Sequence, residues 1–269
     1  MPLFIGTSGW QYRDWRGSFY PQKLPQGQWL EHYAARFQTV EVNNAFYRLP
    51  EATTFNGWAR RTPTDFVMAV KASRFLTHVK RLKEPQEPVQ RFLERARRLG
   101  RKLGPVLIQL PPQFKVDAAR LDETLALFPR DVRVAVEFRH ASWFNDEVQA
   151  VLAGRRAALC LADSPWRRTP VWRTAGWGFL RLHEGTGSPR PCYPERLLES
   201  WAGTLLETWG GAEVFVYFNN DHRCCAVHDA VRFAEIAERR GLSPTRVPRP
   251  DEVTVVGAGP DRMATSPRS

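Results

Sequence analysis

Four side chains able to do acid–base chemistry stand within short runs of otherwise apolar residues. Glu41 lies in TVEVNN, Glu137 in VRVAVEFR, Lys71 in FVMAVKA and His183 in GFLRLHE. Two carboxyl groups that share a cavity can divide acid and base work when their surroundings separate their pKa values. A desolvated lysine can act as a cation or a base, and a histidine can move protons near neutral pH. These four residues are the predicted catalytic groups.

A divalent metal is the alternative use of the same residues. His183, Asp163 and the two glutamates together offer nitrogen and oxygen ligands. The predicted site also contains three cations, including Arg139 and Arg181, which would repel a metal ion. We therefore predict no metal and no other cofactor.

These residues need elements that bring them to one place. Helix-length polar segments separate eight short apolar runs, at 3–8, 39–44, 66–72, 106–112, 132–139, 157–163, 178–184 and 213–221. Regular alternation of strand and helix predicts a parallel sheet, and eight repeats favour a single closed (β/α)8 TIM barrel. An open doubly wound sheet is the second choice, but GTSGW after the first run is not the G-x-G-x-x-G fingerprint.

Alternation along each strand predicts which side chains face the barrel interior. The inward set becomes polar toward the carboxyl end of the strands, where such barrels carry their chemistry. It consists of Glu41, Asn43, Lys71, Gln109, Glu137, Arg139, Asp163, Arg181, His183, Tyr217 and Asn219. Three acids face three bases in this set, so we expect the charges to pair with one another or with a ligand.

Seven motifs of the chain resemble a known family. IGTSGWQYRDWRGSFYP, VEVNNAFYRLP, FVMAVKASRFLTH, GPVLIQLPPQF, VAVEFRHASWF, LRLHEG and VYFNND are similar, in that order, to the YecE-like domain-of-unknown-function family (DUF72). The resemblance covers about residues 4–241 and implies a (β/α)8 barrel without naming a substrate. By motif match it places the family's inward polar set at Glu41, Asn43, Lys71, Gln109, Glu137, Arg139, His183 and Asn219. HRCCAVHDA, after FNND, departs from the pattern.

The chain is basic, with a formal net charge of +11. Residues 74–102 hold ten Lys or Arg against three Glu, a local excess of seven. Arg74 and His78 follow the third strand and are predicted to draw a negatively charged substrate to the mouth. Trp10 and Tyr12 follow the first strand and are predicted to stack on a sugar or a nucleobase, or else to cover the barrel.

The four cysteines show no disulfide framework pattern. Cys160 lies in an apolar run, Cys192 stands alone, and Cys224 and Cys225 are adjacent. This usage fits a reducing cytoplasm. DHRCCAVH at 221–228 superficially resembles a set of zinc ligands, but adjacent cysteines lack the usual C-x2–4-C spacing. With no signal peptide and no membrane-length apolar stretch, we expect a cytoplasmic protein without a membrane partner.

Residues 1–241 are predicted to form one domain, and the Pro-, Gly- and Ser-rich residues 242–269 a disordered tail. The favoured function is acid–base chemistry, hydrolytic or isomerising, on a small polar or anionic ligand. Nucleic-acid binding or phosphodiester processing is the first alternative, and a non-catalytic small-ligand binding module is the second. The sequence indicates no oligomeric state.

Overall fold

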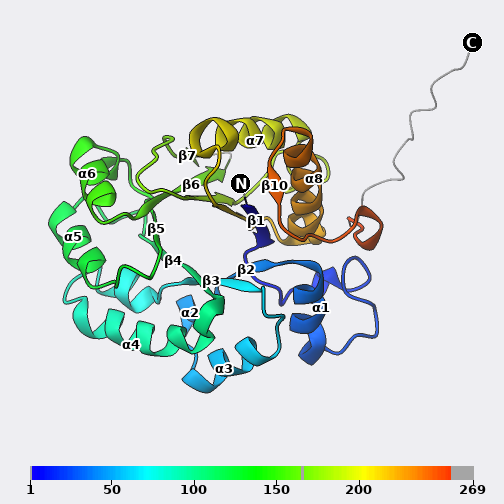
Figure 1. Ribbon diagram of the computed structural model, residues 1–269, viewed down its shortest axis with the longest axis horizontal. Helices are drawn as coiled ribbons and strands as arrows, with labels where there is room; N and C mark the ends of the chain where they lie inside the picture. Colours follow the sequence, from blue (N-terminus) through cyan, green and yellow to red (C-terminus); the bar gives the residue numbers. More distant parts are fainter. Residues whose placement is uncertain (1, 165–166, 256–269) are drawn as a thin grey trace, which may run out of the picture.

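The computed structural model describes residues 2–164 and 167–255 as a curled sheet surrounded by helices (Figure 1). The long strands fall on the eight predicted runs: β1 (Pro2–Thr7), β2 (Thr39–Val42), β3 (Val67–Lys71), β4 (Leu103–Gln109), β5 (Val134–Glu137), β6 (Ala158–Ser164), β8 (Gly178–Leu182) and β9 (Val214–Phe218). Two short strands are added, β7 (Arg167–Arg168) and β10 (Ser243–Pro244). The hydrogen-bonded order is β10-β1-β9-β8-β6-β5-β4-β3-β2, and these neighbours pair in parallel.

Helices connect the strands and cover the outside of the sheet (Figure 1). They are α1 (Trp29–Arg36), α2 (Asn44–Tyr47), α3 (Ala52–Arg60), α4 (Gln86–Ala96), α5 (Ala118–Ala126), α6 (Asp146–Gly154), α7 (Glu195–Trp209) and α8 (Cys225–Arg239). Shorter helical turns are η1 (Arg13–Trp15), η2 (Gln26–Gln28), η3 (Phe75–Val79), η4 (Arg97–Lys102), η5 (Ala141–Trp143), η6 (His222–Cys224) and η7 (Pro250–Glu252). Side-chain caps start some helices, as where Asn145 Oδ1 accepts from the Val148 amide at 3.0 Å.

Side chains of the sheet form two apolar cores on its two faces. The outer core lies between strands and helices and includes Val40, Ile108 and Val136. The inner core fills the ring with Ala69, Leu107, Ala135, Ala158, Cys160, Trp177, Phe179, Phe215 and Tyr217. This division matches the predicted alternation in β2, β3, β4, β5, β8 and β9, which puts their polar ends at one rim.

In β6 the predicted alternation is wrong. Leu159 and Leu161 belong to the outer core, whereas Ala158 and Cys160 face the ring interior. In the run AALCLAD, both sets of alternating residues are apolar, so the sequence does not show which set faces the interior. The large aromatic rings of the neighbouring strands occupy the interior, and β6 contributes its small residues there. Asp163 is consequently directed outward.

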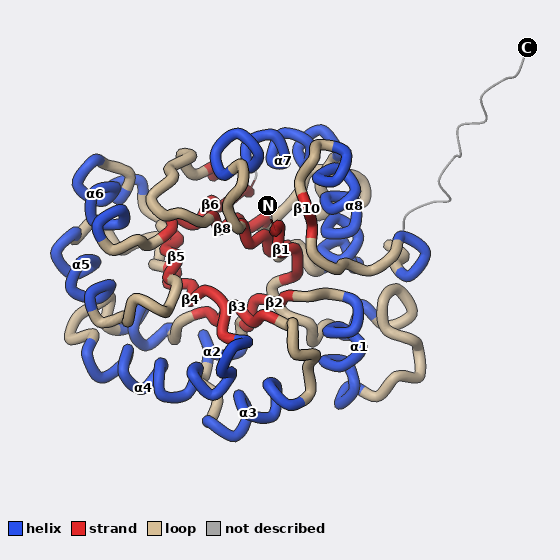
Figure 2. The backbone as a smooth tube through the Cα atoms, in the orientation of Figure 1, coloured by secondary structure: helices blue, strands red, loops and turns tan. Residues whose placement is uncertain are grey.

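The two ends of the eight-strand path, β1 and β2, lie side by side (Figure 2). The Tyr33 hydroxyl joins them, because it accepts from the Thr7 amide at 3.0 Å and donates to the Thr39 carbonyl at 3.1 Å. A Cβ at Gly6 would lie 2.4 Å from that carbonyl oxygen, so only glycine permits this approach. The sheet is therefore curled into a ring whose β1–β2 contact depends on a side chain.

Residues 242–255 are packed against the curled sheet and its helices, so the prediction of a disordered tail is wrong for this part. Leu242 is buried, and β10 pairs with β1, where the Thr245 amide donates to the Leu3 carbonyl at 2.9 Å. The Arg246 carbonyl accepts from the Gln38 amide at 3.1 Å. Unpaired backbone groups at the amino ends of β1 and β2 supply these bonds, which composition does not reveal. Residues 256–269 lie outside the described residues.

No helix in residues 2–164 and 167–255 is long and apolar enough to cross a membrane.

Replacing Tyr33 by Phe tests the β1–β2 contact. The change leaves a buried amide and a buried carbonyl without their partner, which costs about 1–3 kcal/mol of unfolding free energy. Denaturant titration of the two proteins measures this difference. Tyr47→Phe is the matched control, because Tyr47 is 74% exposed and its loss of a hydroxyl is expected to have little effect. Equal stability of the two variants would show that the contact does not depend on Tyr33.

Candidate active site at the carboxyl ends of the strands

A cavity of about 700 Å³ opens at the carboxyl ends of the strands. Its volume lies within the range of small-molecule sites. The predicted residues that line it are Trp10, Tyr12, Asn43, Lys71, Arg74, His78, Gln109, Arg139, Arg181, His183 and Asn219. Gly9, Gln11, Asn44, Phe46, Tyr47 and Asp221 complete the wall. The structure thus brings most of the predicted set to one mouth.

Arg181 occupies the centre of the site and joins two carboxylates below the cavity. Its Nη2 lies 2.7 Å from Glu41 Oε1 and its Nη1 lies 2.7 Å from Glu137 Oε2. All three side chains are buried, and they come from β8, β2 and β5. Buried ions need such pairing, because each loses several kcal/mol of hydration. The predicted pairing of the inward charges is therefore observed here.

Glu137 has further partners on both oxygens. Gln109 Nε2 donates to Oε2 at 2.9 Å, Arg139 Nε donates to Oε1 at 3.2 Å, and His183 Nε2 lies 3.3 Å from Oε1. Burial alone would raise the pKa of Glu137, but His183, Arg181 and Arg139 hold it well below its usual range. Glu137 therefore keeps its negative charge near neutral pH, which favours a fixed electrostatic role over that of a general acid.

Burial lowers the pKa of His183, and the charge of Arg181 lowers it further, against the opposing effect of Glu137. His183 Nε2 lies 3.3 Å from Glu137 Oε1 and 3.4 Å from Arg181 Nη1, and Nδ1 lies 3.3 Å from Asn219 Nδ2. These three contacts hold the ring at the edge of the cavity.

Asp221 is a cavity-lining carboxyl group that the sequence reasoning missed. Burial raises its pKa to about 7, with the charges of Asp14 and Glu41 adding to the effect and Tyr12 and Arg181 opposing it. Its Oδ1 is buried and has no hydrogen-bond partner in the described residues. The sequence does contain a signal for this residue. Asp221 lies two residues after Asn219, so strand alternation would direct both side chains to the same face. A carboxyl group that titrates near neutral pH can both donate and accept a proton.

Lys71 and His78 line the same cavity from β3 and the helical turn η3 after it. Lys71 is 8% exposed, and its Nζ lies 4.0 Å from the centre of the Phe46 ring. Burial lowers the pKa of Lys71 to about 8, assisted by the charge of Arg181. Burial and the charge of Lys71 lower the pKa of His78 to about 4, so its ring is neutral near pH 7. The His78 ring lies 4.9 Å from the ring of Phe46, centre to centre.

Two predicted site residues lie elsewhere. Asp163 Oδ2 accepts from Trp201 Nε1 at 2.8 Å, so it faces α7 and not the cavity. The Asp163 carboxylate is therefore not directed toward His183, Glu41 and Glu137, whereas the alternative divalent-metal site would require all four side chains to converge. Tyr217 does face the ring interior, but it lies below the cavity, where its hydroxyl is 2.7 Å from Thr39 Oγ1.

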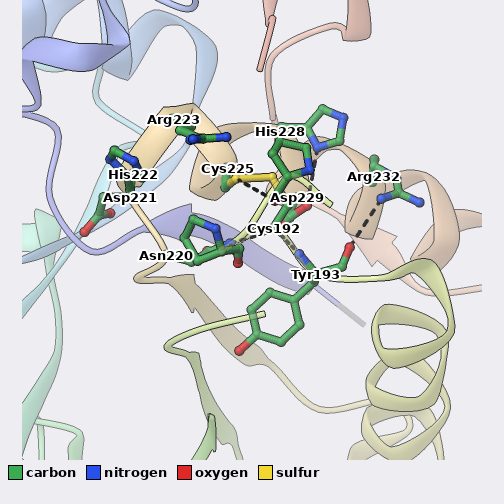
Figure 3. Close-up of a disulfide and its surroundings, with 12 residues drawn as sticks. Cys192, Tyr193, Asn220, Asp221, His222, Arg223, Cys225, His228, Asp229 and Arg232 are labelled. Carbon is green, nitrogen blue, oxygen red and sulfur yellow. Dashed lines mark hydrogen bonds and ion pairs between the residues drawn. A yellow bond between two sulfur atoms is a disulfide. The ribbon is translucent and has the colours of Figure 1, made fainter. Parts of the chain in front are cut away.

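The cysteines differ from the prediction, because Cys192 and Cys225 form a disulfide (Figure 3). The bond links two segments 33 residues apart in sequence, so local spacing gave no sign of it. It fixes the loop after β8 to the start of α8, assisted by Asp229, whose Oδ2 accepts from the Tyr193 amide at 2.7 Å. The set resembling zinc ligands at 221–228 is thereby divided, since Cys225 is bonded to sulfur and Cys224 is buried.

The central ion pairs can be tested with Arg181→Met. The variant leaves two carboxylates buried without their cation, which costs about 3–5 kcal/mol of unfolding free energy by denaturant titration. Arg155→Met removes an exposed pair with Asp122 and is expected to cost less than about 1 kcal/mol. If Arg181→Met does not fold, adding Glu41→Gln and Glu137→Gln should restore folding, because the buried charges are then gone. An Arg181→Met cost no larger than that of Arg155→Met would contradict this account.

The raised pKa of Asp221 predicts a pH-dependent stability. Its folded pKa of about 7 lies above the ordinary value, so its contribution is fully present below about pH 4 and is lost as the pH rises through 7. Asp221→Asn resembles the protonated form. We therefore expect it to match the wild type at pH 4 and to exceed it by on the order of 4 kcal/mol at pH 8. The exposed Asp131→Asn is the control, and a pH-independent difference for Asp221→Asn would refute the assignment.

The sequence of this chain is similar to those of two bacterial proteins. YunF of Bacillus subtilis (strain 168), described as a UPF0759 protein, is 29% identical over 283 residues, 91% of this chain and 99% of YunF. YecE of Escherichia coli (strain K12), also described as a UPF0759 protein, is 28% identical over 155 residues. That alignment covers 56% of this chain and 54% of YecE.

Solved structures also superimpose on this chain. A DUF72 family protein from Thermotoga maritima MSB8 superimposes with a TM-score of 0.79 at 29% identity, over 88% of this chain and 100% of that one. A DUF72 family protein from Enterococcus faecalis V583 shares the fold, with a TM-score of 0.74 at 20% identity over 88% of this chain and 95% of its own. A family model described as "Protein of unknown function DUF72" matches residues 4–252, which include the packed segment after residue 241. The chain belongs to the DUF72 family of proteins of unknown function.

Proposed function

We propose that this chain is an enzyme that performs acid–base chemistry, hydrolytic or isomerising, on a small anionic substrate. The site is the cavity at the carboxyl rim of the curled sheet, which we interpret as a (β/α)8-type barrel. Active sites of such barrels lie at that rim. One observation carries the proposal: a carboxyl group with a pKa of about 7 and an ammonium group with a pKa of about 8 line the same cavity of about 700 Å³.

The charges of the wall favour an anionic substrate. Glu41 and Glu137 are paired with Arg181 beneath the cavity. The remaining cations, Lys71 and Arg74, have no ion pair within the described part of the chain, and both line the cavity. A small molecule bearing a phosphate or carboxylate group would compensate these charges. Arg139 lies beside them, with one contact to Glu137 and a partly exposed guanidinium.

The roles of the acidic residues follow from their surroundings. Asp221 is the proposed general acid and base, because it changes charge near neutral pH. Glu41 and Glu137 serve as fixed charges that hold Arg181, instead of dividing the proton transfers between them as the sequence suggested. Asn43 and Gln109 present amide groups to the cavity and are proposed to orient the substrate. Asn43 Oδ1 is buried without a hydrogen-bond partner in the described residues, which leaves it available to a donor of the substrate.

The structure supports nucleic-acid binding less well. In the basic stretch 74–102, Arg95 lies 3.1 Å from Glu51 and Arg97 lies 3.0 Å from Asp131, so part of the excess charge is paired. Lys102 Nζ donates to the Ala59 carbonyl at 2.6 Å. These groups would have to exchange their partners for phosphates. A cavity with its titrating groups at the rim is better matched to a small molecule than to a nucleic-acid strand.

The test is conversion of a mixture of small phosphorylated and carboxylated metabolites, followed by mass spectrometry. The wild type is expected to deplete at least one compound. Asp221→Asn should slow that depletion by about 10²–10⁴-fold, the usual contribution of a general acid or base. Asp131→Asn, an exposed carboxylate paired with Arg97, is the matched control and should act at the wild-type rate.

Two outcomes would decide against the proposal. Binding of small anions without any conversion would indicate a non-catalytic binding module. Conversion by Asp221→Asn at the wild-type rate would remove Asp221 from the mechanism.

A further inference from the structure

Lys71 has an unusual environment for a lysine. It ends β3, is almost fully buried, and yet lines the cavity. No carboxylate lies within ion-pair distance of its Nζ in the residues that the structure describes, although Glu41 and Glu137 are buried in the same ring. Arg181 and Arg139 take those carboxylates instead. The face of the Phe46 ring covers the amine on one side at 4.0 Å.

We infer that Lys71 Nζ is a nucleophile that forms an imine with a substrate carbonyl, so the substrate is a small carbonyl compound bearing an anionic group. This inference rests on the proposed function and specifies the substrate class of the same site. The geometry carries it: the amine lies over the Phe46 ring and lines the cavity, and no carboxylate in residues 2–164 and 167–255 lies within ion-pair distance of it. Arg74 and Arg139 line the same cavity and are placed to receive the anionic group.

The electrostatics of the site agree with this role. An imine requires the neutral amine, and an ordinary lysine is almost wholly protonated at neutral pH. Burial and the charge of Arg181 lower the pKa of Lys71 to about 8. At pH 7.5 about a quarter of such a group is neutral, compared with about one part in a thousand of an unperturbed lysine. An arginine would bind an anion at least as well, so simple anion binding does not require a lysine here.

The chemical step balances without a further reactant. The Lys71 ammonium first loses a proton, and the neutral nitrogen attacks the carbonyl carbon to form a carbinolamine. Loss of the hydroxyl group as water, with return of the proton, gives a protonated imine. An ammonium ion and a carbonyl compound thus yield an iminium ion and one water molecule. The first proton leaves to solvent in the open cavity, and Asp221, which lines the same cavity and has a pKa of about 7, can return one.

The iminium ion would then serve the acid–base chemistry proposed above. It withdraws electrons from the adjacent carbon, so a proton on that carbon becomes easier to remove. Asp221 reaches the cavity from the turn after β9, separated from β3 by β1 and β2 around the ring. A substrate held between the two residues would present its carbonyl to Lys71 and a neighbouring carbon or oxygen to Asp221.

The test uses glyoxylate, a small anionic aldehyde, with cyanoborohydride to reduce any imine to a stable carboxymethyl-lysine. Peptide mass spectrometry of the wild-type protein then gives the extent of modification at each lysine. At pH 7.5 we expect Lys71 to react about tenfold or more faster than the exposed Lys23 and Lys115. Its rate should rise with a midpoint near pH 8, and inorganic phosphate should slow it by competing for the arginines.

Matched variants complete the design. Lys71→Arg keeps the charge and should abolish the fast modification while leaving the slow background at Lys23 and Lys115. Lys102→Arg should leave the fast modification unchanged, because Lys102 Nζ donates to the carbonyls of Ala59 and Thr62 away from the cavity. Modification of Lys71 no faster than that of Lys23 would overturn the inference.

This failure is distinct from failure of the proposed function. If Lys71 reacts slowly but Asp221→Asn still abolishes metabolite conversion, the enzyme works without an imine. If Lys71 reacts fast and selectively while no metabolite is converted, the nucleophile is present and the acid–base role of Asp221 is what fails.

Discussion

One guanidinium group determines how the polar rim of this molecule is arranged. Arg181 contacts Glu41 and Glu137 at 2.7 Å each, and so connects β8 with β2 and β5 across the interior of the ring. Two carboxylates in this apolar setting would repel one another and would be poorly hydrated. Arg181 removes both problems with a single planar group that can donate in two directions. The remaining polar side chains are then placed around this fixed centre.

The same pairing determines the character of the cavity above it. Arg181 takes both glutamates, so within the described part of the chain Lys71 has no carboxylate at ion-pair distance, and the positive charge of Arg181 lowers its pKa against the effect of Glu41 and Glu137. Glu137 and Asn219 hold the His183 ring at the edge of the cavity. Burial dominates the pKa of Asp221, and Tyr12 and Arg181 oppose it only in part. The ion pairs of Arg181 with Glu41 and Glu137 and a reactive site are therefore not alternatives here. These ion pairs help to set the pKa values of the groups that line the cavity.

The sequence was most informative where polar and apolar residues alternate strictly. In β2, β5 and β8, a charged residue with an apolar residue on each side leaves one inward assignment, and Glu41, Glu137 and Arg181 all take it. In β6 both parities are apolar, so only the packing of the aromatic interior decides the direction of Asp163. Asp221 was missed because it lies beyond the end of β9 at Phe218, and the predicted inward set ends at Asn219, one alternation before it.

Other features depend on contacts between distant segments, which local patterns do not encode. The Cys192–Cys225 disulfide joins a loop to a helix that are close only after the ring has formed. Residues 242–255 are rich in residues typical of disorder, but hydrogen bonds to Leu3 and Gln38 hold them in place. The Tyr33 hydroxyl likewise joins β1 to β2, strands 32 positions apart from Thr7 to Thr39.

The position of Lys71 relative to the Arg181–glutamate ion pairs also determines how nucleophilic its amine is. If the lysine were moved closer to Glu41 or Glu137, an ion pair would raise its pKa and suppress its nucleophilicity. If Arg181 were missing, the charges of Glu41 and Glu137 would raise the pKa of Lys71 without its opposing effect. The neutral fraction of the amine therefore depends on a competition that the guanidinium wins, because it is planar and makes two short contacts at once. Removing Arg181 would therefore change the pKa of Lys71 and with it the reactivity of the amine.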